Sequence, residues 1–308
     1  MRRGPRVALG LVAAAAIAAA ITGCGLGAGP GTGRASLTIT QSFGSKQIGS
    51  TTTAHVPGSE TVMRMLERRF NVSTRYGGGF VESINGHSGT SLRNDWFYYV
   101  NGIEATSGAA TTTVHHGDRV WWDLHDWTVT DTVPAVVGSF PEPFLNGTGG
   151  KRYPVTLECA NDVQAACERV GSELKAVGVP SAPQLLGTGS GTDSIAVVVG
   201  TWADVRGEIA GALIGNGPKT SGVYVRFVNG ALQLLNPRGQ TVRTLRTGAG
   251  LIAATSENQS APTWLVTGTD AAGVNAAAHE LTPAALHDHF ALAVQGGVGI
   301  PVPLEAGT

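Results

Sequence analysis

Asp123 and His125 are the two side chains in this sequence whose types and spacing best suit binding of a metal ion or a polar ligand. They stand two residues apart in a predicted strand, where alternate side chains share a face. A carboxylate and an imidazole on one face could hold a metal ion or a polar ligand. An isolated pair of this kind more often lies on a solvated strand face, and both interpretations stay open.

Two other groups of histidines, at 115–116 and 287–289, are weaker candidates for metal binding. His287, Asp288 and His289 fall on a helix predicted over 284–290. Positions i and i+2 of a helix point to different faces, so these two histidines do not readily share an ion. His115 and His116 precede a turn and are predicted to face solvent. The sequence therefore predicts no metal site.

The sequence lacks the motifs of several enzyme classes. It has no Gly-x-Ser-x-Gly segment to present a nucleophilic serine. Gly187-x-Gly189-x-Gly191 precedes a predicted strand, whereas a dinucleotide fingerprint follows one. Gly149-Gly150-Lys151-Arg152 lacks the spacing and the Ser or Thr of a phosphate loop. We therefore predict that the protein is not an enzyme, and we assign it no cofactor.

Two aromatic segments, Trp96–Gly102 and Gly117–Trp122, carry the strongest indication of binding. Each is predicted to contain a strand, and Asn101-Gly102 is predicted to form a turn. Alternation places Trp96 and Tyr98 on one face, with Phe97 and Tyr99 on the other. One face should cover a helix predicted over 60–70, which leaves aromatic side chains on the second face.

That second aromatic face has two interpretations. It could contact a ligand or a partner, or it could pack against the second half of the chain through Phe140 and Phe144. The candidate ligand-binding residues are Trp96, Tyr98, Tyr99, Asn101 and Trp122.

The N-terminus resembles the export signal of bacterial lipoproteins. Three arginines precede an apolar run from Val7 to Ile21, which is shorter than the ~20 residues of a membrane span. Ile21-Thr22-Gly23-Cys24 resembles a lipobox, with ordinary cleavage as the alternative. The resemblance implies a signal peptide over 1–24 and lipidation of Cys24, the site to test for palmitate. Glycine-rich residues 25–35 are predicted to tether the protein to the extracytoplasmic face of the bacterial cell membrane.

Charge and cysteine content narrow the class of protein further. The chain has 308 residues, of which 42% are hydrophobic and 14% charged, as expected for a globular protein of about two domains. Loss of the signal's three arginines would leave a mildly acidic protein, so we expect no nucleic-acid partner. In an oxidising compartment Cys159 and Cys167 are predicted to form a disulfide, with two buried free thiols as the alternative.

The predicted fold class is α+β, with two domains in sequence. Residues 36–130 alternate as strand, helix (60–70) and several strands, including one over 111–114. Residues 131–150 are a Pro/Gly-rich connection. Residues 151–308 are predicted to form an α/β domain with a mixed sheet, whose role the pattern does not indicate. Its predicted helices cover 162–177, 203–213, 271–281 and 284–290.

The aromatic segments carry a family resemblance. Trp96-x-Tyr98-Tyr99-Val100-Asn101-Gly102, Gly108-Ala109 and Gly117-Asp118-x-Val120-x-Trp122 resemble the bacterial domain of unknown function DUF4430. That domain is similar to the C-terminal domain of transcobalamin and intrinsic factor, which implies a β-grasp-like fold and a cobalamin-like ligand. The large α-helical toroid that supplies most cobalamin contacts in the animal proteins has no counterpart in this sequence.

Together these features predict a membrane-anchored extracytoplasmic binding lipoprotein. We expect it to capture a small organic, cobalamin-like ligand, for delivery to a transporter. The alternative is a cell-envelope module that binds or assembles another protein and takes no small-molecule ligand.

Overall fold

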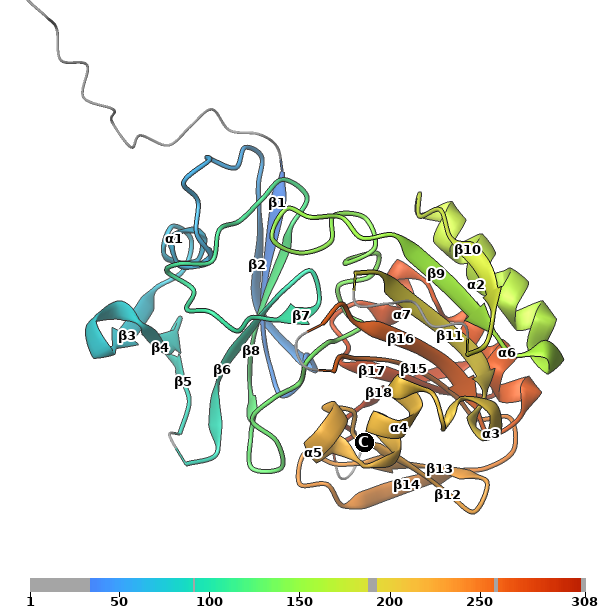
Figure 1. The fold of residues 1–308 in the computed structure, drawn as a ribbon. Helices are drawn as coiled ribbons and strands as arrows, with labels where there is room; N and C mark the ends of the chain where they lie inside the picture. Colours follow the sequence, from blue (N-terminus) through green and yellow to red (C-terminus); the bar gives the residue numbers. More distant parts are fainter. Residues whose placement is uncertain (1–33, 91, 188–192, 258–259, 306–308) are drawn as a thin grey trace, which may run out of the picture.

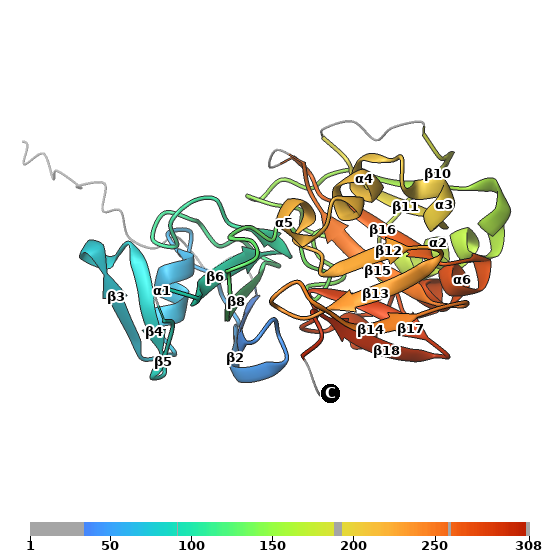
Figure 2. The same ribbon diagram turned by 90° about the horizontal axis from the view of Figure 1, so that it is seen from below.

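The protein is α+β and forms two lobes, which Figures 1 and 2 show side by side. A computed structural model describes residues 34–90, 92–187, 193–257 and 260–305. The first lobe is built on a five-stranded sheet and the second on a seven-stranded sheet. Among the described helices, none has the length and apolar character needed to cross a membrane. The predicted signal peptide, Cys24 and nearly all of the predicted tether lie outside the described residues.

The first sheet has the strand order β2-β1-β8-β6-β7. The N-terminal strand β1 pairs in parallel with β8 and antiparallel with β2, while β6 pairs antiparallel with β8 and β7. A central parallel pair of this kind fits the β-grasp-like fold that the resemblance implies. The strand bounds are β1 (Ala35–Gln41), β2 (Lys46–Thr53), β6 (Asn94–Val100), β7 (Ile103–Glu104) and β8 (Arg119–Asp126).

Helix α1 (Val62–Glu67) buries Val62, Met63, Met65 and Leu66 in the core of the first lobe. It begins after Thr61, whose hydroxyl accepts a hydrogen bond from the Arg64 backbone N–H at 3.3 Å. A small sheet of β3 (Val72–Arg75), β4 (Phe80–Ile84) and β5 (His87–Ser88) follows the helix, with a short 3-10 turn η1 (Tyr76–Gly78) between β3 and β4.

The second sheet has the order β10-β9-β11-β16-β15-β17-β18. The first four of these strands are parallel, and the last three join antiparallel, so the sheet is mixed as predicted. The bounds are β9 (Val155–Cys159), β10 (Ala182–Leu185), β11 (Ile195–Thr201), β15 (Gly250–Thr255), β16 (Thr263–Gly268), β17 (Ala291–Gln295) and β18 (Val298–Val302).

Both faces of this sheet are buried, because its strands alternate between two hydrophobic cores. Val197 and Val199 pack under helices α2 (Gln164–Ala176) and α6 (Ala271–His279). Helix α2 follows the short 3-10 turn η2 (Asn161–Val163), and α6 follows β16. Ala196 and Val198 pack on the opposite side, against an antiparallel meander and short helices. The meander comprises β12 (Val225–Val228), β13 (Ala231–Leu235) and β14 (Thr241–Leu245), and the helices are α3 (Trp202–Val205), α4 (Ile209–Gly215) and α5 (Pro218–Ser221).

Three predicted elements differ from the structure. The helix predicted over 203–213 is broken into α3 and α4, since Gly207 disfavours helix and Glu208 has extended backbone angles. The helix predicted over 284–290 ends early as α7 (Pro283–Leu286), and Asp288 adopts a positive φ of 58°. The predicted strand over 111–114 amounts to one bridge between Thr113 and Thr61.

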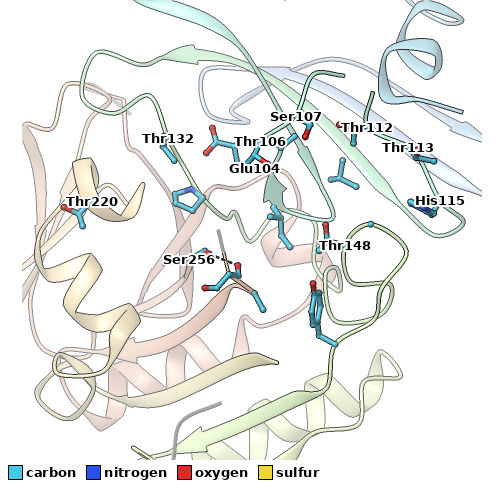
Figure 3. Close-up of a pocket in the computed structure, with 18 residues that line it drawn as sticks. Glu104, Thr106, Ser107, Thr112, Thr113, His115, Thr132, Thr148, Thr220 and Ser256 are labelled. Carbon is cyan, nitrogen blue, oxygen red and sulfur yellow. Dashed lines mark hydrogen bonds between the residues drawn. The ribbon is translucent and has the colours of Figure 1, made fainter. Parts of the chain in front are cut away.

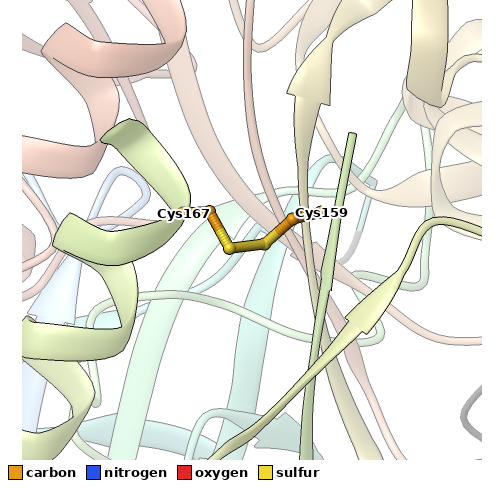
Figure 4. Close-up of a disulfide and its surroundings, with 2 residues drawn as sticks. All are labelled: Cys159 and Cys167. Atoms are coloured by element: carbon orange, nitrogen blue, oxygen red, sulfur yellow. A yellow bond between two sulfur atoms is a disulfide. The ribbon is translucent and has the colours of Figure 1, made fainter. Parts of the chain in front are cut away.

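A disulfide joins Cys159 at the end of β9 to Cys167 on α2, which confirms the predicted pair (Figure 4). It closes a short loop, with a sequence separation of 8. Loop-closure entropy predicts that Cys159→Ala/Cys167→Ala lowers the free energy of unfolding by about 2.5 kcal/mol. Urea unfolding measures this. Reductant should destabilise the natural chain and leave the double variant unchanged, whereas equal stability of the two chains would contradict the prediction.

Candidate functional site

Three of the predicted ligand-binding aromatics lie in the core of the first lobe. Trp96, Tyr98 and Trp122 share the sheet face beneath α1, as alternation predicts, and each is buried. The rings of Tyr98 and Trp122 stack with centroids 4.8 Å apart. The Tyr98 hydroxyl also contacts the Thr112 hydroxyl at 2.8 Å. These side chains therefore have protein neighbours where the sequence had placed a ligand.

The opposite face of the sheet is covered by the second lobe. Tyr99 and Trp121 form a buried cluster with Phe43, Tyr224 and Phe290. Tyr99 is 0% exposed. The structure thus shows that this face packs against the second half of the chain, which is one of the two alternatives that the sequence left open. Phe290 makes this contact; Phe140 and Phe144 pack against Trp264 inside the second lobe instead.

Asn101, the fifth predicted ligand-binding residue, is fully buried in the turn after β6. Its amide group donates to an Asp118 carboxylate oxygen and to the Gly147 carbonyl, both at 2.8 Å. Its side-chain oxygen accepts from the Arg119 backbone N–H at 2.8 Å. With both ends of the amide bonded to protein, Asn101 fixes the turn between β6 and β7.

Asp123 and His125 are buried where the two lobes meet, which corrects the expectation of a solvated strand face. They are 0% and 2% exposed, and an Asp123 oxygen lies 2.9 Å from His125 Nδ1. The Asp123 carboxylate also accepts from the backbone N–H groups of Phe43 and Gly44. Within the described residues, no three His, Cys, Asp or Glu side chains are grouped so that they could hold a metal ion.

The His287–His289 group also differs from its predicted setting. These residues follow α7 in a loop, so the helical spacing argument does not apply to them. Burial raises the pKa of the Asp288 carboxyl and lowers the pKa of the His289 imidazole. Asp288 and His289 are therefore partly buried in a loop, whereas His287 is 63% exposed.

A pocket of about 990 Å³ lies between the lobes (Figure 3). This volume is within the range of roughly 300–1,000 Å³ typical of small-molecule sites. Figure 3 shows Glu104, Thr106 and Ser107 of the first lobe across the space from Thr220 and Ser256 of the second. Hydroxyl groups dominate the polar lining, which comprises Thr106, Ser107, Thr112, Thr113, Thr132, Thr148, Thr220, Ser256 and Ser260, with Glu104, His115 and Tyr153.

The turn between β6 and β7 positions Glu104 at this pocket. Asn101 and Gly102 have φ of 56° and 76°, which an Asn-Gly pair tolerates. A Cβ at Gly102 would meet the Val136 carbonyl oxygen at 2.8 Å, so the turn packs directly on the connection between the lobes. The Glu104 backbone N–H then donates to the Pro134 carbonyl at 3.1 Å, and its Oε2 accepts from the Val133 N–H at 3.0 Å.

Glu104 is the one carboxyl group among the described lining residues, none of which is Lys or Arg. Burial raises its pKa to about 7, and the neighbouring Asp131 carboxylate adds to the rise. The hydrogen bond from the Val133 N–H lowers the pKa of Glu104 and offsets part of this rise. The pocket therefore holds a carboxyl group that changes charge near neutral pH.

The raised pKa of Glu104 predicts a pH-dependent stability. An unfolded Glu titrates near 4.3, so between about pH 4.5 and 7 the folded state keeps a proton that the unfolded state has lost. The free energy of unfolding should therefore fall as pH rises through this window. Glu104→Gln keeps an acceptor for Val133 and has no charge. It should match the natural chain near pH 4 and exceed it by up to ~3 kcal/mol at pH 8. Urea unfolding at both pH values tests this; a constant difference would contradict it.

Sequence reasoning missed this pocket. Glu104 stands two residues after a recognised turn, which is a local signal that it lies at a sheet edge. Its neighbours Thr132, Thr220 and Ser256 come from distant segments, and no sequence spacing relates them.

Comparisons with known proteins match only part of the chain. The model of the domain of unknown function DUF4430 matches residues 59–126, from just before α1 to the end of β8, and the rest of the chain has no family match. No curated protein matches the chain. The crystal structure of a "putative metal binding protein" from Ruminococcus gnavus is similar over 31% of this chain and 98% of its own, with 14% identity and a TM-score of 0.25.

Proposed function

We propose that this protein is a lipid-anchored extracytoplasmic binding protein that captures a small organic molecule in the pocket between its lobes. The observation that carries the proposal is that pocket: both lobes line it, and its volume suits a small molecule. A site at a domain junction is a common location for ligands. The aromatic residues Trp96, Tyr98, Tyr99 and Trp122 are buried and do not line this pocket.

The proposed activity is capture without chemical conversion. The polar lining consists mainly of hydroxyls, which suit hydrogen bonding to a polar molecule. A protein held at the membrane surface could pass such a ligand to a transporter. A cobalamin-like molecule is implied by the family resemblance alone, so cyanocobalamin is one probe among several.

The test uses the full-length protein in detergent, with glucose, pentane-1,5-diol, 5-aminopentan-1-ol and cyanocobalamin as probes in isothermal titration calorimetry. Thr220→Trp should fill part of the pocket and weaken binding at least tenfold. Val298→Trp is the control, because Val298 is 62% exposed and does not line the pocket. If no probe binds, or if Thr220→Trp binds as well as the natural chain, the proposal fails.

The lipid anchor is proposed from the lipobox, and labelling tests it separately. Cells grown with radiolabelled palmitate should label the natural chain, and Cys24→Ala should carry no label. Equal labelling of the two chains would exclude lipidation at Cys24.

A second candidate function, binding of an envelope protein, has one observation in its favour. Tyr76 and Phe80, at the tip of the small sheet, are 88% and 43% exposed. Exposed aromatic groups are typical of protein contacts. If this tip binds a partner, Tyr76→Ser/Phe80→Ser should abolish recovery of that partner by crosslinking in intact cells and leave ligand binding unchanged. An unchanged crosslinking pattern would exclude the tip.

A further inference from the structure

We infer that the ligand of the interlobe pocket carries an organic ammonium group that pairs with the Glu104 carboxylate, while hydroxyl groups of the wall bind its polar remainder. This inference rests on the proposed function and adds the chemical class of the ligand.

The first support is the position of the Glu104 side chain. The bond from the Val133 N–H to Oε2, together with the backbone bond to Pro134, fixes this residue at the pocket. A carboxylate can accept about four hydrogen bonds, so its remaining capacity is available to a ligand that donates. An ammonium group offers donors and a positive charge.

The second support is the charge around this carboxylate. No Lys or Arg is among the described residues that line the pocket. Lys151, which lies over the Tyr153 ring, is paired with Asp193 at 3.1 Å. The other titratable groups near Glu104 are Asp131 and Tyr99, while His115 and Tyr153 line the pocket elsewhere. Asp131 adds negative potential, which favours a cation over an anion.

The third support is the rest of the wall. Threonine and serine hydroxyls also line the pocket, and their oxygens can accept from or donate to a polar ligand. Val100, Ile103, Ala105 and Pro134 supply apolar surface on the same wall. A short carbon chain with an ammonium at one end and hydroxyl groups elsewhere fits this combination.

The test compares 5-aminopentan-1-ol with pentane-1,5-diol. The first carries an ammonium group at the chain end where the second carries a hydroxyl group. We expect the amine to bind the full-length protein at least about tenfold more tightly at pH 8 by calorimetry. The alkylammonium stays charged at both pH 8 and pH 5.5, whereas Glu104 takes up a proton between them. The preference should therefore shrink several-fold at pH 5.5. Glu104→Gln should show no preference at either pH. The control Glu67→Gln, at an exposed residue of α1 that does not line the pocket, should keep the pH-dependent preference.

The outcomes separate this inference from the proposed function. Equal binding of the two probes at pH 8, or a preference that survives in Glu104→Gln, would overturn the inference. If the inference fails in this way but Thr220→Trp weakens binding of both probes, the pocket is still the binding site for small molecules, and only the ammonium class of the ligand is wrong. If neither probe binds and the other probes also fail, the proposed function itself fails.

Discussion

Asp123→Ala should lower the free energy of unfolding by about 3–5 kcal/mol, one of the two largest effects that we expect from a single substitution in this chain. The Asp123 carboxylate is 0% exposed and accepts hydrogen bonds from three residues at and just after the end of β1. It accepts from the Thr40 hydroxyl at 2.5 Å and from the Phe43 and Gly44 N–H groups at 3.0 and 2.9 Å. Alanine would leave these buried donors without their acceptor.

Urea unfolding measures this loss, and Asp126→Ala is the matched control. Asp126 ends the same strand and pairs with Arg93 at 3.0 Å, where the Arg93 side chain is 49% exposed. Asp126 also accepts from Thr128, and because these partners are exposed we expect Asp126→Ala to cost only about 1 kcal/mol. If the two substitutions cost the same, the buried network does not hold the turn after β1.

Phe290→Ala should cost about 3–5 kcal/mol and should also weaken ligand binding. Phe290 follows α7 and is 3% exposed. Its ring meets the rings of Phe43, Tyr99 and Trp121 with centroid separations of 5.1, 5.6 and 5.2 Å. Truncation would leave a cavity between the lobes, and the pocket needs both lobes held in place.

Differential scanning calorimetry and probe titration measure the two effects of Phe290→Ala. Phe80→Ala is the control, because Phe80 is 43% exposed and lies in the small sheet away from the junction. Phe80→Ala should change neither property by much. Unchanged probe affinity in Phe290→Ala would show that the pocket does not depend on this contact between the lobes.

The arrangement of each aromatic strand was predictable, because it depends on local periodicity. Trp96 and Tyr98 point to the helix, and Tyr99 points to the other side, as the period of two requires. What covers Tyr99 was not predictable, since Phe290 lies far along the chain in a segment predicted to be helical. In the structure α7 ends at Leu286, and Phe290 lies beyond it.

The burial of Asp123 likewise could not be predicted from the sequence. Its spacing from His125 was visible in the sequence, and the shared strand face was predicted correctly. Its burial depends on the parallel pairing that sets Thr40 opposite Asp123, a contact between the two ends of the first lobe. The sequence analysis assigned no strand to β15 or β17 for a related reason: their alanine and glycine residues have weak strand preference, and burial in the sheet decides their structure.

Hydrogen–deuterium exchange of the full-length protein, with and without the tightest-binding of the probes named above, tests the central claim most directly. Capture between the lobes predicts that the probe slows exchange in both lobes at once, in the peptides containing 103–107 and 132–134 and in those containing 220 and 256. Exchange elsewhere, including the exposed tip near Tyr76, should not change. Protection confined to one lobe, or found only outside these peptides, would contradict the claim that the pocket between the lobes is the binding site.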